Sequence, residues 1–361
     1  MNKTTIKHRE ISAALKNAIV SGRHRAGDRL PSEEALCRRW QVSRPTVRRA
    51  LRDLLQSGLV DIRAGSGCYV SAGLRVTRPV IALLADGLGK TEILDPICAE
   101  ISRAAHDAGC TVLNTPLTVA GADGDLAKTL VARNVSGVIF APLEHGADRE
   151  RRNRDLLDAF RRAGAAVVLA DRDTAEFPAR SDCDVVALDN FHAGYLLGRH
   201  LTVSGARRVV FVAKPNYPSS TDLRLAGLQN GLLRHGGRKP EFKVGDPRDV
   251  AFVKSLRAAR QGFDAVVCSN DLTAAQFLQA ATNSGWRVPE DFLLAGFDDV
   301  SYASLLSTPL TTIRQPCADI GSVCVRTLLE RLRHPQLPPR TILLTGELVV
   351  RASTTRVVLR V

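Results

Sequence analysis

Residues 42–60, VSRPTVRRALRDLLQSGLV, determine how the first part of this chain folds. Ser43 is a good N-cap residue, and Pro45 falls in the first helical turn, where its missing N–H costs nothing and its fixed φ suits a helix. Apolar residues then recur at helical spacing, at Val47, Ala50, Leu51, Leu54 and Leu55. The stretch therefore predicts an amphipathic helix with one face packed on a core.

Basic side chains occupy another face of this helix, at Arg44, Arg48 and Arg52. Thr46 and Arg49 flank that face, so we expect the first two turns to present hydroxyl and guanidinium groups outward. Such donors suit phosphate oxygens and guanine edges in the major groove of DNA. Arginines at helical spacing also occur on ordinary solvated faces, so the neighbouring segments decide between the two interpretations.

The neighbouring segments favour a DNA-binding motif. Residues 31–34 (PSEE) predict a capped helix start with acids in its positive first turn, and a two-residue link, 41–42, separates this helix from Ser43. Two helices joined by so short a turn form a helix-turn-helix. Residues 59–63 and 68–71 flank AGSG at 64–67, which predicts a β-hairpin that serves as a wing.

Residues 6–71 resemble the winged helix-turn-helix of the GntR family of transcription regulators. The resemblance is carried by GDRLPSE at 27–33, VSRPTVRRAL at 42–51, SGLV at 57–60 and GSGCYV at 65–70. It implies that the arginines of the VSRxTVR pattern and the glycine-rich wing tip contact DNA. One position departs from the family, because Glu34 stands where a DNA-contacting residue such as arginine is common. The candidate DNA-binding residues are Ser32, Ser43, Arg44, Thr46, Arg48, Arg49, Gly65, Ser66 and Gly67.

Positive charge is concentrated in this part of the chain. Residues 1–78 contain 16 Lys and Arg against 6 Asp and Glu, a net charge of +10 out of +13 for the 361 residues. A basic excess confined to one small domain is expected for nucleic-acid binding. The whole chain is too long for one compact domain and suits two or three.

Targeting and metal-binding signals are absent from the sequence. No apolar run follows the first charged residues, and no 18-residue apolar segment occurs, so we expect a cytoplasmic protein with no membrane partner. The eight cysteines lack CxxC pairs and nearby histidines at metal spacing, which predicts reduced thiols. No metal and no cofactor is expected.

The domain boundaries follow from a change of pattern. A first helix is expected over about 5–20, so that residues 1–73 form the winged domain, and residues 74–78 form a linker. Residues 80–85 (VIALLA) then form a continuous apolar run, typical of a strand buried on both faces of a parallel sheet. Further strand signals, separated by amphipathic helices, lie at 111–113, 137–141, 166–170, 185–188, 207–213, 242–245, 265–269 and 293–297.

These strands fall into two sets, which predict an α/β domain of two doubly wound parallel-sheet subdomains over 79–361. We assign about 79–189 plus 315–335 to the first subdomain and about 190–312 plus 340–353 to the second. Ligands of such sheets bind beyond the carboxyl ends of the strands, here in the cleft between the subdomains. Polar residues follow several strands, although acids at strand ends also cap the next helix, and we expect this role for Asp271 and Asp299.

Residues 79–353 resemble the effector domain of LacI-family regulators, which shares the type I fold of periplasmic sugar-binding proteins. The motifs are VALDN at 186–190, LRLAG at 223–227, SNDLTAA at 269–275, VPEDFLLAGFDD at 288–299 and STPLTTIRQPCADIG at 307–321. The resemblance places the effector contacts at Asp86, Asp171, Arg224, Asn270, Asp298 and Gln315. Carboxylates, an amide and a forked guanidinium suit sugar hydroxyls, which donate and accept together.

Two departures from the LacI pattern are informative. The position after TTIRQP, often an aromatic wall, is Cys317, which leaves Phe242 or Phe252 as stacking candidates. The family's own helix-turn-helix and hinge helix are replaced by the GntR-type domain, an arrangement similar to the arabinose-repressor (AraR) type. This similarity implies a monosaccharide, with a pentose as the first choice.

Other functional classes fit less well. An enzyme could use Asp298 and Asp299, but adjacent residues on one strand end point apart, and the sequence has no GxSxG, Walker lysine or HExxH motif. A transport-type binding protein would need a signal peptide and no winged helix. We therefore predict a homodimeric repressor that binds a palindromic operator and is released by a sugar, with a co-repressor mode or a purine or sugar-phosphate ligand as the alternative.

Overall fold

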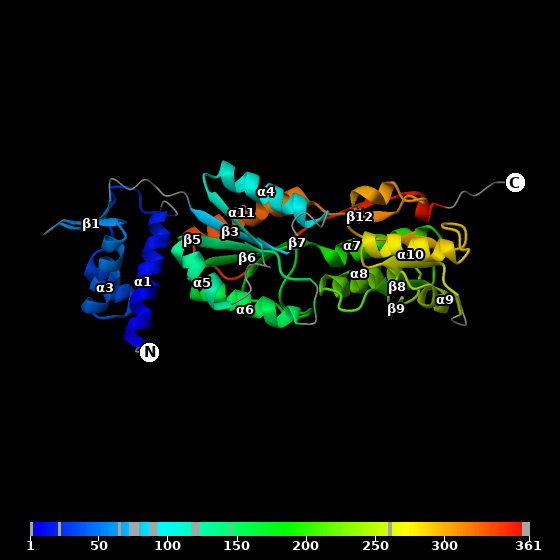
Figure 1. Cartoon of the computed structure of the whole chain (residues 1–361), viewed down its shortest axis with the longest axis horizontal. Helices are drawn as coiled ribbons and strands as arrows, with labels where there is room; N and C mark the ends of the chain where they lie inside the picture. Colours follow the sequence, from blue (N-terminus) through cyan, green and yellow to red (C-terminus); the bar gives the residue numbers. More distant parts are fainter. Residues whose placement is uncertain are drawn as a thin grey trace.

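The computed structural model describes residues 3–20, 23–63, 66–71, 79–86, 92–116, 123–144, 146, 148–258 and 262–355. Figure 1 shows three bodies in a row, with the winged domain at one end, the first subdomain in the middle and the second at the other end. The helix nearest the middle body is α1 (Lys3–Val20), whose Lys16 Nζ donates to Asn134 Oδ1 at 2.8 Å. The predicted linker, residues 74–78, lies outside the described residues.

The winged domain is built as the sequence predicts. Helices α1, α2 (Glu33–Trp40) and α3 (Arg44–Gln56) pack around one apolar core that includes Ile11, Leu36, Val47 and Leu54. Strands β1 (Val60–Arg63) and β2 (Gly67–Val70) form an antiparallel pair, and Arg29 forms an antiparallel bridge with Tyr69 of β2. Because α3 packs its apolar face on this core, its other face is exposed to solvent.

The first subdomain is a six-stranded parallel sheet in the order β13-β7-β6-β5-β3-β4. Its strands are β3 (Val80–Ala85), β4 (Thr111–Pro116), β5 (Val135–Phe140), β6 (Ala166–Ala170), β7 (Asp184–Leu188) and β13 (Thr341–Leu344). Helices α4 (Leu94–Asp107) and α11 (Cys317–Arg333) cover one face, and α5 (Asp123–Ala132) and α6 (Arg149–Arg162) cover the other (Figure 1). The fully apolar strands are therefore buried on both faces.

The second subdomain has a four-stranded parallel sheet in the order β11-β10-β8-β9. Its strands are β8 (Val209–Ala213), β9 (Glu241–Val244), β10 (Ala265–Cys268) and β11 (Leu293–Ala295). Helices α7 (Asn190–Val203) and α8 (Ser220–Arg234) lie on one face, and α9 (Val250–Ala258) and α10 (Asp271–Asn283) lie on the other. Two 3-10 helices, η1 (Ser301–Ser304) and η2 (Ala352–Thr354), and the antiparallel pair β12 (Thr312–Arg314) and β14 (Glu347–Val349) complete it.

The chain passes between the two subdomains three times, after β7, after β12 and after β13. One predicted boundary is wrong, because residues 341–344 were assigned to the second subdomain. They form β13, which pairs in parallel with β7 of the first sheet, with Thr341 opposite Val185. The crossings place the carboxyl ends of the strands of both sheets toward the space between the subdomains.

Candidate functional site

The exposed face of α3 is the candidate DNA-binding surface. Arg44, Arg49 and Arg52 are exposed, as predicted. Arg48 is also exposed, and its Nε lies 3.0 Å from Glu33 Oε2 at the start of α2. This ion pair ties the two helices of the motif together and orients the Arg48 guanidinium.

The prediction that Thr46 faces outward is wrong. Its side chain is buried, and its hydroxyl lies 3.1 Å from the Ser43 hydroxyl. The spacing could have revealed this, since Thr46 stands four residues before Ala50 and extends the apolar stripe toward the start of the helix. Ser43 occupies the N-cap position, although its side chain bonds Thr46 and not the helix backbone.

The remaining predicted DNA contacts lie at a helix start and on the wing. Ser32 caps α2, with its Oγ accepting from the Ala35 N–H at 3.2 Å. On the wing, the Ser66 hydroxyl lies 2.7 Å from the Tyr69 hydroxyl. Gly67 has φ 120°, and a Cβ there would meet the Arg29 guanidinium at 3.0 Å. Gly65 lies outside the described residues.

A cavity of about 300 Å³ lies between the two subdomains, at the carboxyl ends of their strands. Its lining includes five of the six predicted effector residues, namely Asp171, Arg224, Asn270, Asp298 and Gln315. The sixth, Asp86, is exposed just after β3 and is not among the described residues that line the cavity. The lining also contains Glu144, Arg172, Asn190 and Tyr302, none of which is among the predicted effector contacts.

Arg224 is the centre of the second-subdomain wall. Its Nε donates to Asn190 Oδ1 at 2.8 Å, its Nη1 donates to the Ser269 carbonyl at 2.6 Å, and its Nη2 lies 3.2 Å from Asp298 Oδ1. The guanidinium also lies over the Phe297 ring, 4.8 Å from its centroid. With only 7% of the residue exposed, this arginine is held in one orientation.

The position of Arg224 depends on close packing between α7 and α8. A Cβ at Gly194 would lie 2.1 Å from the Arg224 carbonyl oxygen, and one at Gly227 would lie 1.9 Å from the Phe191 carbonyl oxygen. Gly198 and Gly231 leave similarly little room. The two helices therefore touch backbone to backbone, and this contact fixes the turn of α8 that carries Arg224.

Two strand-end acids face each other across the cavity on strained backbone. Asp171 has φ 73° and Asp298 has φ 120°, conformations that residues other than glycine seldom adopt. Their backbone N–H groups are held by the Val186 and Ile313 carbonyls, each at 2.8 Å. Strain of this kind is concentrated at ligand sites, where the surrounding structure maintains it.

The charge state of Asp298 is set by its surroundings. Burial raises its pKa to about 6, against the opposing effects of Arg224 and of the hydrogen bond from Gln315. Gln315 Nε2 donates to Asp298 Oδ1 at 2.7 Å, whereas Gln315 Oε1 is buried and has no hydrogen-bond partner within the described structure. A ligand hydroxyl could donate to that oxygen.

The other acids near the cavity are structural. Asp299 is ion-paired with Arg314 at 2.7 Å and with Arg351 at 2.6 Å, so it stabilises the loop and does not cap a helix as predicted. Asp271 is fully buried, accepts from the Thr312 hydroxyl at 2.7 Å and from the Val300 N–H at 3.2 Å, and has its pKa raised by burial. The N-cap of α10 is instead Asn270, whose Oδ1 accepts from the Thr273 N–H at 2.9 Å.

Aromatic contacts differ from the prediction. Tyr302 of η1 lines the cavity. Phe242 packs against Phe211 and Tyr217, and Phe252 packs on the core beneath α9 and α10, so neither lines it.

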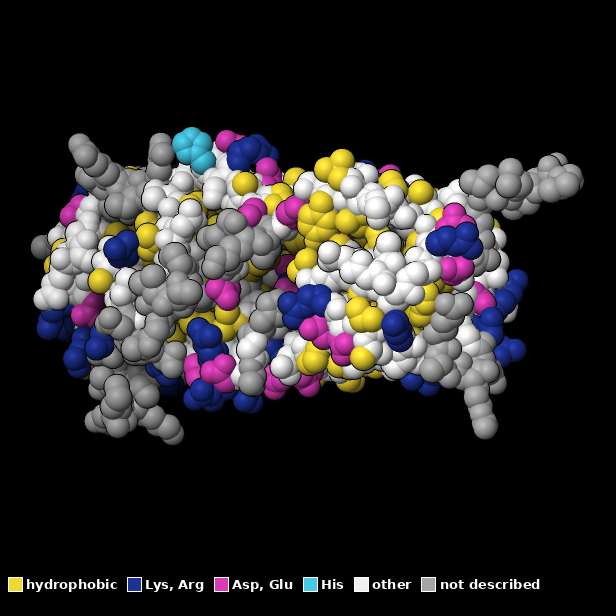
Figure 2. Space-filling model, turned by 45° about the vertical axis from the view of Figure 1, so that its right-hand side comes forward, with side chains coloured by type: hydrophobic (Ala, Val, Ile, Leu, Met, Phe, Trp, Pro, Cys, Tyr) yellow, Lys and Arg dark blue, Asp and Glu magenta, His cyan; other side chains and the backbone are white. Residues whose placement is uncertain are grey.

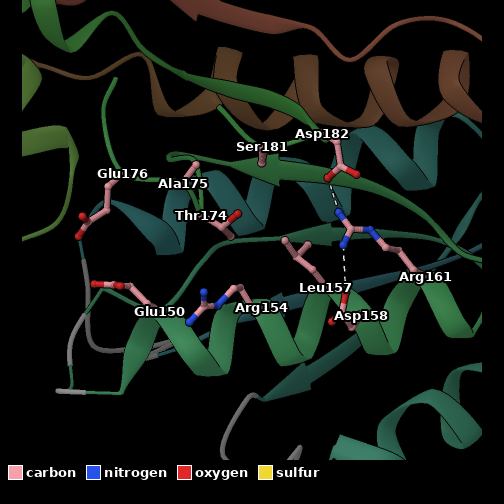
Figure 3. Close-up of a pocket in the computed structure, with 10 residues that line it drawn as sticks. All are labelled: Glu150, Arg154, Leu157, Asp158, Arg161, Thr174, Ala175, Glu176, Ser181 and Asp182. Carbon is pink, nitrogen blue, oxygen red and sulfur yellow. Dashed lines mark hydrogen bonds and ion pairs between the residues drawn. The ribbon is translucent and has the colours of Figure 1, made fainter. Parts of the chain in front are cut away.

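A second hollow of about 350 Å³ lies beside α6, within the first subdomain alone. Figure 3 shows that Arg161 lies between Asp158 and Asp182 and is ion-paired with both. None of the predicted effector residues lines it. The first cavity, in contrast, is lined by residues that follow strands of both subdomains, and it is therefore the candidate effector site.

Among the described residues, no group of three or more His, Cys, Asp or Glu side chains is placed to hold a metal ion. No helix in this part of the chain is long and apolar enough to cross a membrane.

Comparisons with known proteins match both domains of the chain. Residues 7–70 match the family described as bacterial regulatory proteins, gntR family, and residues 199–354 match the periplasmic binding protein-like domain. The arabinose metabolism transcriptional repressor of Geobacillus stearothermophilus is 26% identical over 372 residues, which cover 98% of each chain. The HTH-type transcriptional repressor PurR of Mannheimia succiniciproducens is 30% identical over 235 residues, covering 64% of this chain and 67% of that protein.

Among solved structures, the transcriptional regulator CelR–cellobiose complex shares the fold, with a TM-score of 0.63 and 23% identity over 87% of this chain and 92% of that one. The chain belongs to the DNA-binding transcription regulators that join a GntR-type helix-turn-helix to a LacI-type, periplasmic-binding-protein-like effector domain.

Proposed function

We propose that this protein is a repressor that leaves its operator when a sugar binds between the two subdomains of its effector domain. The observation that carries the proposal is the convergence of Asp171, Arg224, Asp298 and Gln315 on one cavity. Asp171 belongs to the first subdomain, Arg224 and Asp298 belong to the second, and Gln315 lies on the segment that joins β12 to α11. A ligand that bonds all four would hold the subdomains in one relative position. Closure of this kind gives a ligand a different affinity for two states of the protein.

The chemistry of the cavity suits a polyhydroxylated ligand. Gln315 Oε1 offers a buried acceptor, and Asp171 and Asp298 offer carboxylate oxygens. The Asn270 Oδ1 already accepts from the Thr273 N–H, so Asn270 offers a ligand the N–H groups of its side-chain amide. Each charged hydrogen bond to a hydroxyl contributes about 1.5–3 kcal/mol. The similarity to a repressor of arabinose metabolism supports a pentose as the first candidate.

The winged domain would contact DNA through the exposed face of α3, with Arg44, Arg48 and Arg49, and through the wing. One domain of this size reads few base pairs, so specificity requires two half-sites and hence a homodimer on a palindromic operator. Leu305, which follows η1, is 81% exposed and is a candidate for a subunit contact. Apolar side chains gather near the middle of the face seen in Figure 2.

An enzymatic role has little support in the site. The acid next to Asp298 is Asp299, and its carboxylate is occupied by Arg314 and Arg351. A general acid and base pair would need both carboxylates to face one substrate. We therefore propose a regulator without catalytic activity that acts in the cytoplasm.

The experiment combines two assays on the full chain. A thermal-shift screen of free sugars, sugar phosphates and purines identifies the ligand, because a ligand at 100 times its Kd stabilises the folded state by about 2.7 kcal/mol. Operator binding is then measured by fluorescence anisotropy with and without that ligand. Release by a sugar supports the proposal, whereas tighter operator binding with the ligand would establish the co-repressor mode.

A further inference from the structure

The wall of the cavity that belongs to the first subdomain is a cluster of three charged side chains, Glu144, Asp171 and Arg172. Arg172 Nη1 lies 2.8 Å from Glu144 Oε2, and Arg172 Nε donates to Asp171 Oδ2 at 2.9 Å. The three side chains are 12%, 28% and 9% exposed for Arg172, Glu144 and Asp171. Burial alone would lower the pKa of Arg172, but Glu144 and Asp171 outweigh it and raise that pKa.

The opposite wall repeats this arrangement. Arg224 is paired with Asp298, and its other N–H groups donate to Asn190 and to the Ser269 carbonyl. Both arginines that line the cavity thus already have carboxylate partners from the protein. Glu92 also lines it, so four carboxyl groups face two guanidinium groups.

We infer that the cavity selects an uncharged, polyhydroxylated effector and rejects its phosphorylated or carboxylated counterparts, with the Glu144–Arg172 ion pair as the discriminating element. The inference rests on the proposed function, because it assumes that this cavity holds the effector. It goes beyond that function because it states the charge of the effector, which distinguishes a free sugar from a sugar phosphate.

The physical reason is competition for the arginines. Arg172 Nη1 lies within ion-pair distance of Glu144 but makes no hydrogen bond in the described structure, so a phosphate or carboxylate bound there would either displace Glu144 or lie against its carboxylate. Displacement would leave a buried carboxylate without its counter-ion and close to the new anion. Breaking a buried ion pair in this way is strongly unfavourable. A hydroxyl group avoids the cost, since it can donate to a carboxylate oxygen or accept from an N–H while both ion pairs remain intact.

Glu144 is the residue through which this selection can be tested. It follows β5 on a short segment, whereas Asp171 is fixed by the left-handed backbone at the end of β6. In the Glu144→Gln variant, Arg172 keeps Asp171 as a partner but loses one carboxylate, so its Nη1 becomes available to an anion. Glu150→Gln is the matched control, because Glu150 is an exposed residue of α6 that does not line this cavity.

The experiment measures Kd by calorimetry for the full-length wild type, Glu144→Gln and Glu150→Gln. The probes are D-ribose, L-arabinose and D-glucose, each paired with its phosphate ester (ribose 5-phosphate, arabinose 5-phosphate and glucose 6-phosphate). For the sugar that binds, we expect the ester to bind at least about tenfold more weakly to the wild type, equivalent to about 1.4 kcal/mol. We expect Glu144→Gln to narrow that ratio and Glu150→Gln to leave it unchanged.

Three results would overturn the inference. An ester that binds the wild type more tightly than its free sugar would refute the selection for an uncharged effector and leave the proposed function standing. An unchanged ratio in Glu144→Gln, with the melting temperature of the unliganded variant near that of the wild type, would refute the role of Glu144. Failure of every probe to bind the wild type would count against the proposed sugar-sensing function itself.

Discussion

Replacing Arg224 by alanine should destabilise the second subdomain strongly, apart from any effect on the effector. The wild-type guanidinium makes buried hydrogen bonds to Asn190 and Ser269 and a largely buried ion pair with Asp298, whose side chain is 13% exposed. In Arg224→Ala, the Asp298 carboxylate would lose its counter-ion. Breaking a buried ion pair by removing one partner costs about 3–5 kcal/mol, so we expect a loss of this size in the free energy of unfolding.

The assay is urea unfolding of the full chain, followed by the fluorescence of Trp286. This indole is buried among Phe263 and Phe292 in the second subdomain and reports on that subdomain when Trp40, the other tryptophan, is replaced by phenylalanine in every variant.

The control is Arg234→Ala at the other end of the same helix. That side chain is exposed and donates only to Asn230, so its loss should change the free energy of unfolding by no more than about 0.5 kcal/mol. An Arg224→Ala variant as stable as the control would refute the buried network as a stabilising element.

Three further predictions concern the DNA surface, pH and modularity. The Arg44→Ala, Arg48→Ala double variant should lose about 1–3 kcal/mol of operator binding for each arginine that reads a base, and unchanged gel-shift affinity would exclude α3 as the recognition helix. If the ionised carboxylate of Asp298, whose pKa is about 6, accepts from the effector, calorimetry should show affinity falling about tenfold from pH 7 to pH 5, because protonation removes that form. Asp298→Asn should show no such pH dependence, and a flat wild-type profile would contradict the role. A fragment of residues 79–361 should dimerise and bind the effector without DNA affinity, which ultracentrifugation and calorimetry can check; an insoluble or monomeric fragment would argue against the domain boundary.

The sequence predicted those features that depend on local spacing. The apolar stripe of α3 and the continuous apolar runs of the strands reflect burial, which imposes a period of 3.6 residues on a helix and a continuous run on a strand buried on both faces. Asp171 and Asp298 could be placed because ligand residues of parallel sheets follow the strand ends, and Arg224, which lies in α8, was placed by the resemblance of LRLAG to the LacI family. These features require no knowledge of how distant segments meet.

The remaining features depend on contacts between segments that are far apart in the sequence. Glu144 and Arg172 follow different strands, and neither has a local pattern that marks it as a partner of the other. The short strand β13 lies beside β7 only because the chain crosses between the subdomains three times. The glycines of α7 and α8 look like poor helix formers in the sequence, and their purpose becomes clear only when the two backbones meet.

The central claim is that the cavity between the subdomains receives the effector and that its occupation controls operator binding. The most direct test is operator binding by wild type and Asp298→Asn, measured by fluorescence anisotropy across a titration of the sugar found in the thermal-shift screen. We predict that the sugar releases the wild type, whereas Asp298→Asn binds the operator with near wild-type affinity and is not released at the same concentrations. Release of both proteins at the same sugar concentration would contradict the claim, because the effector would then act from a site that does not depend on Asp298.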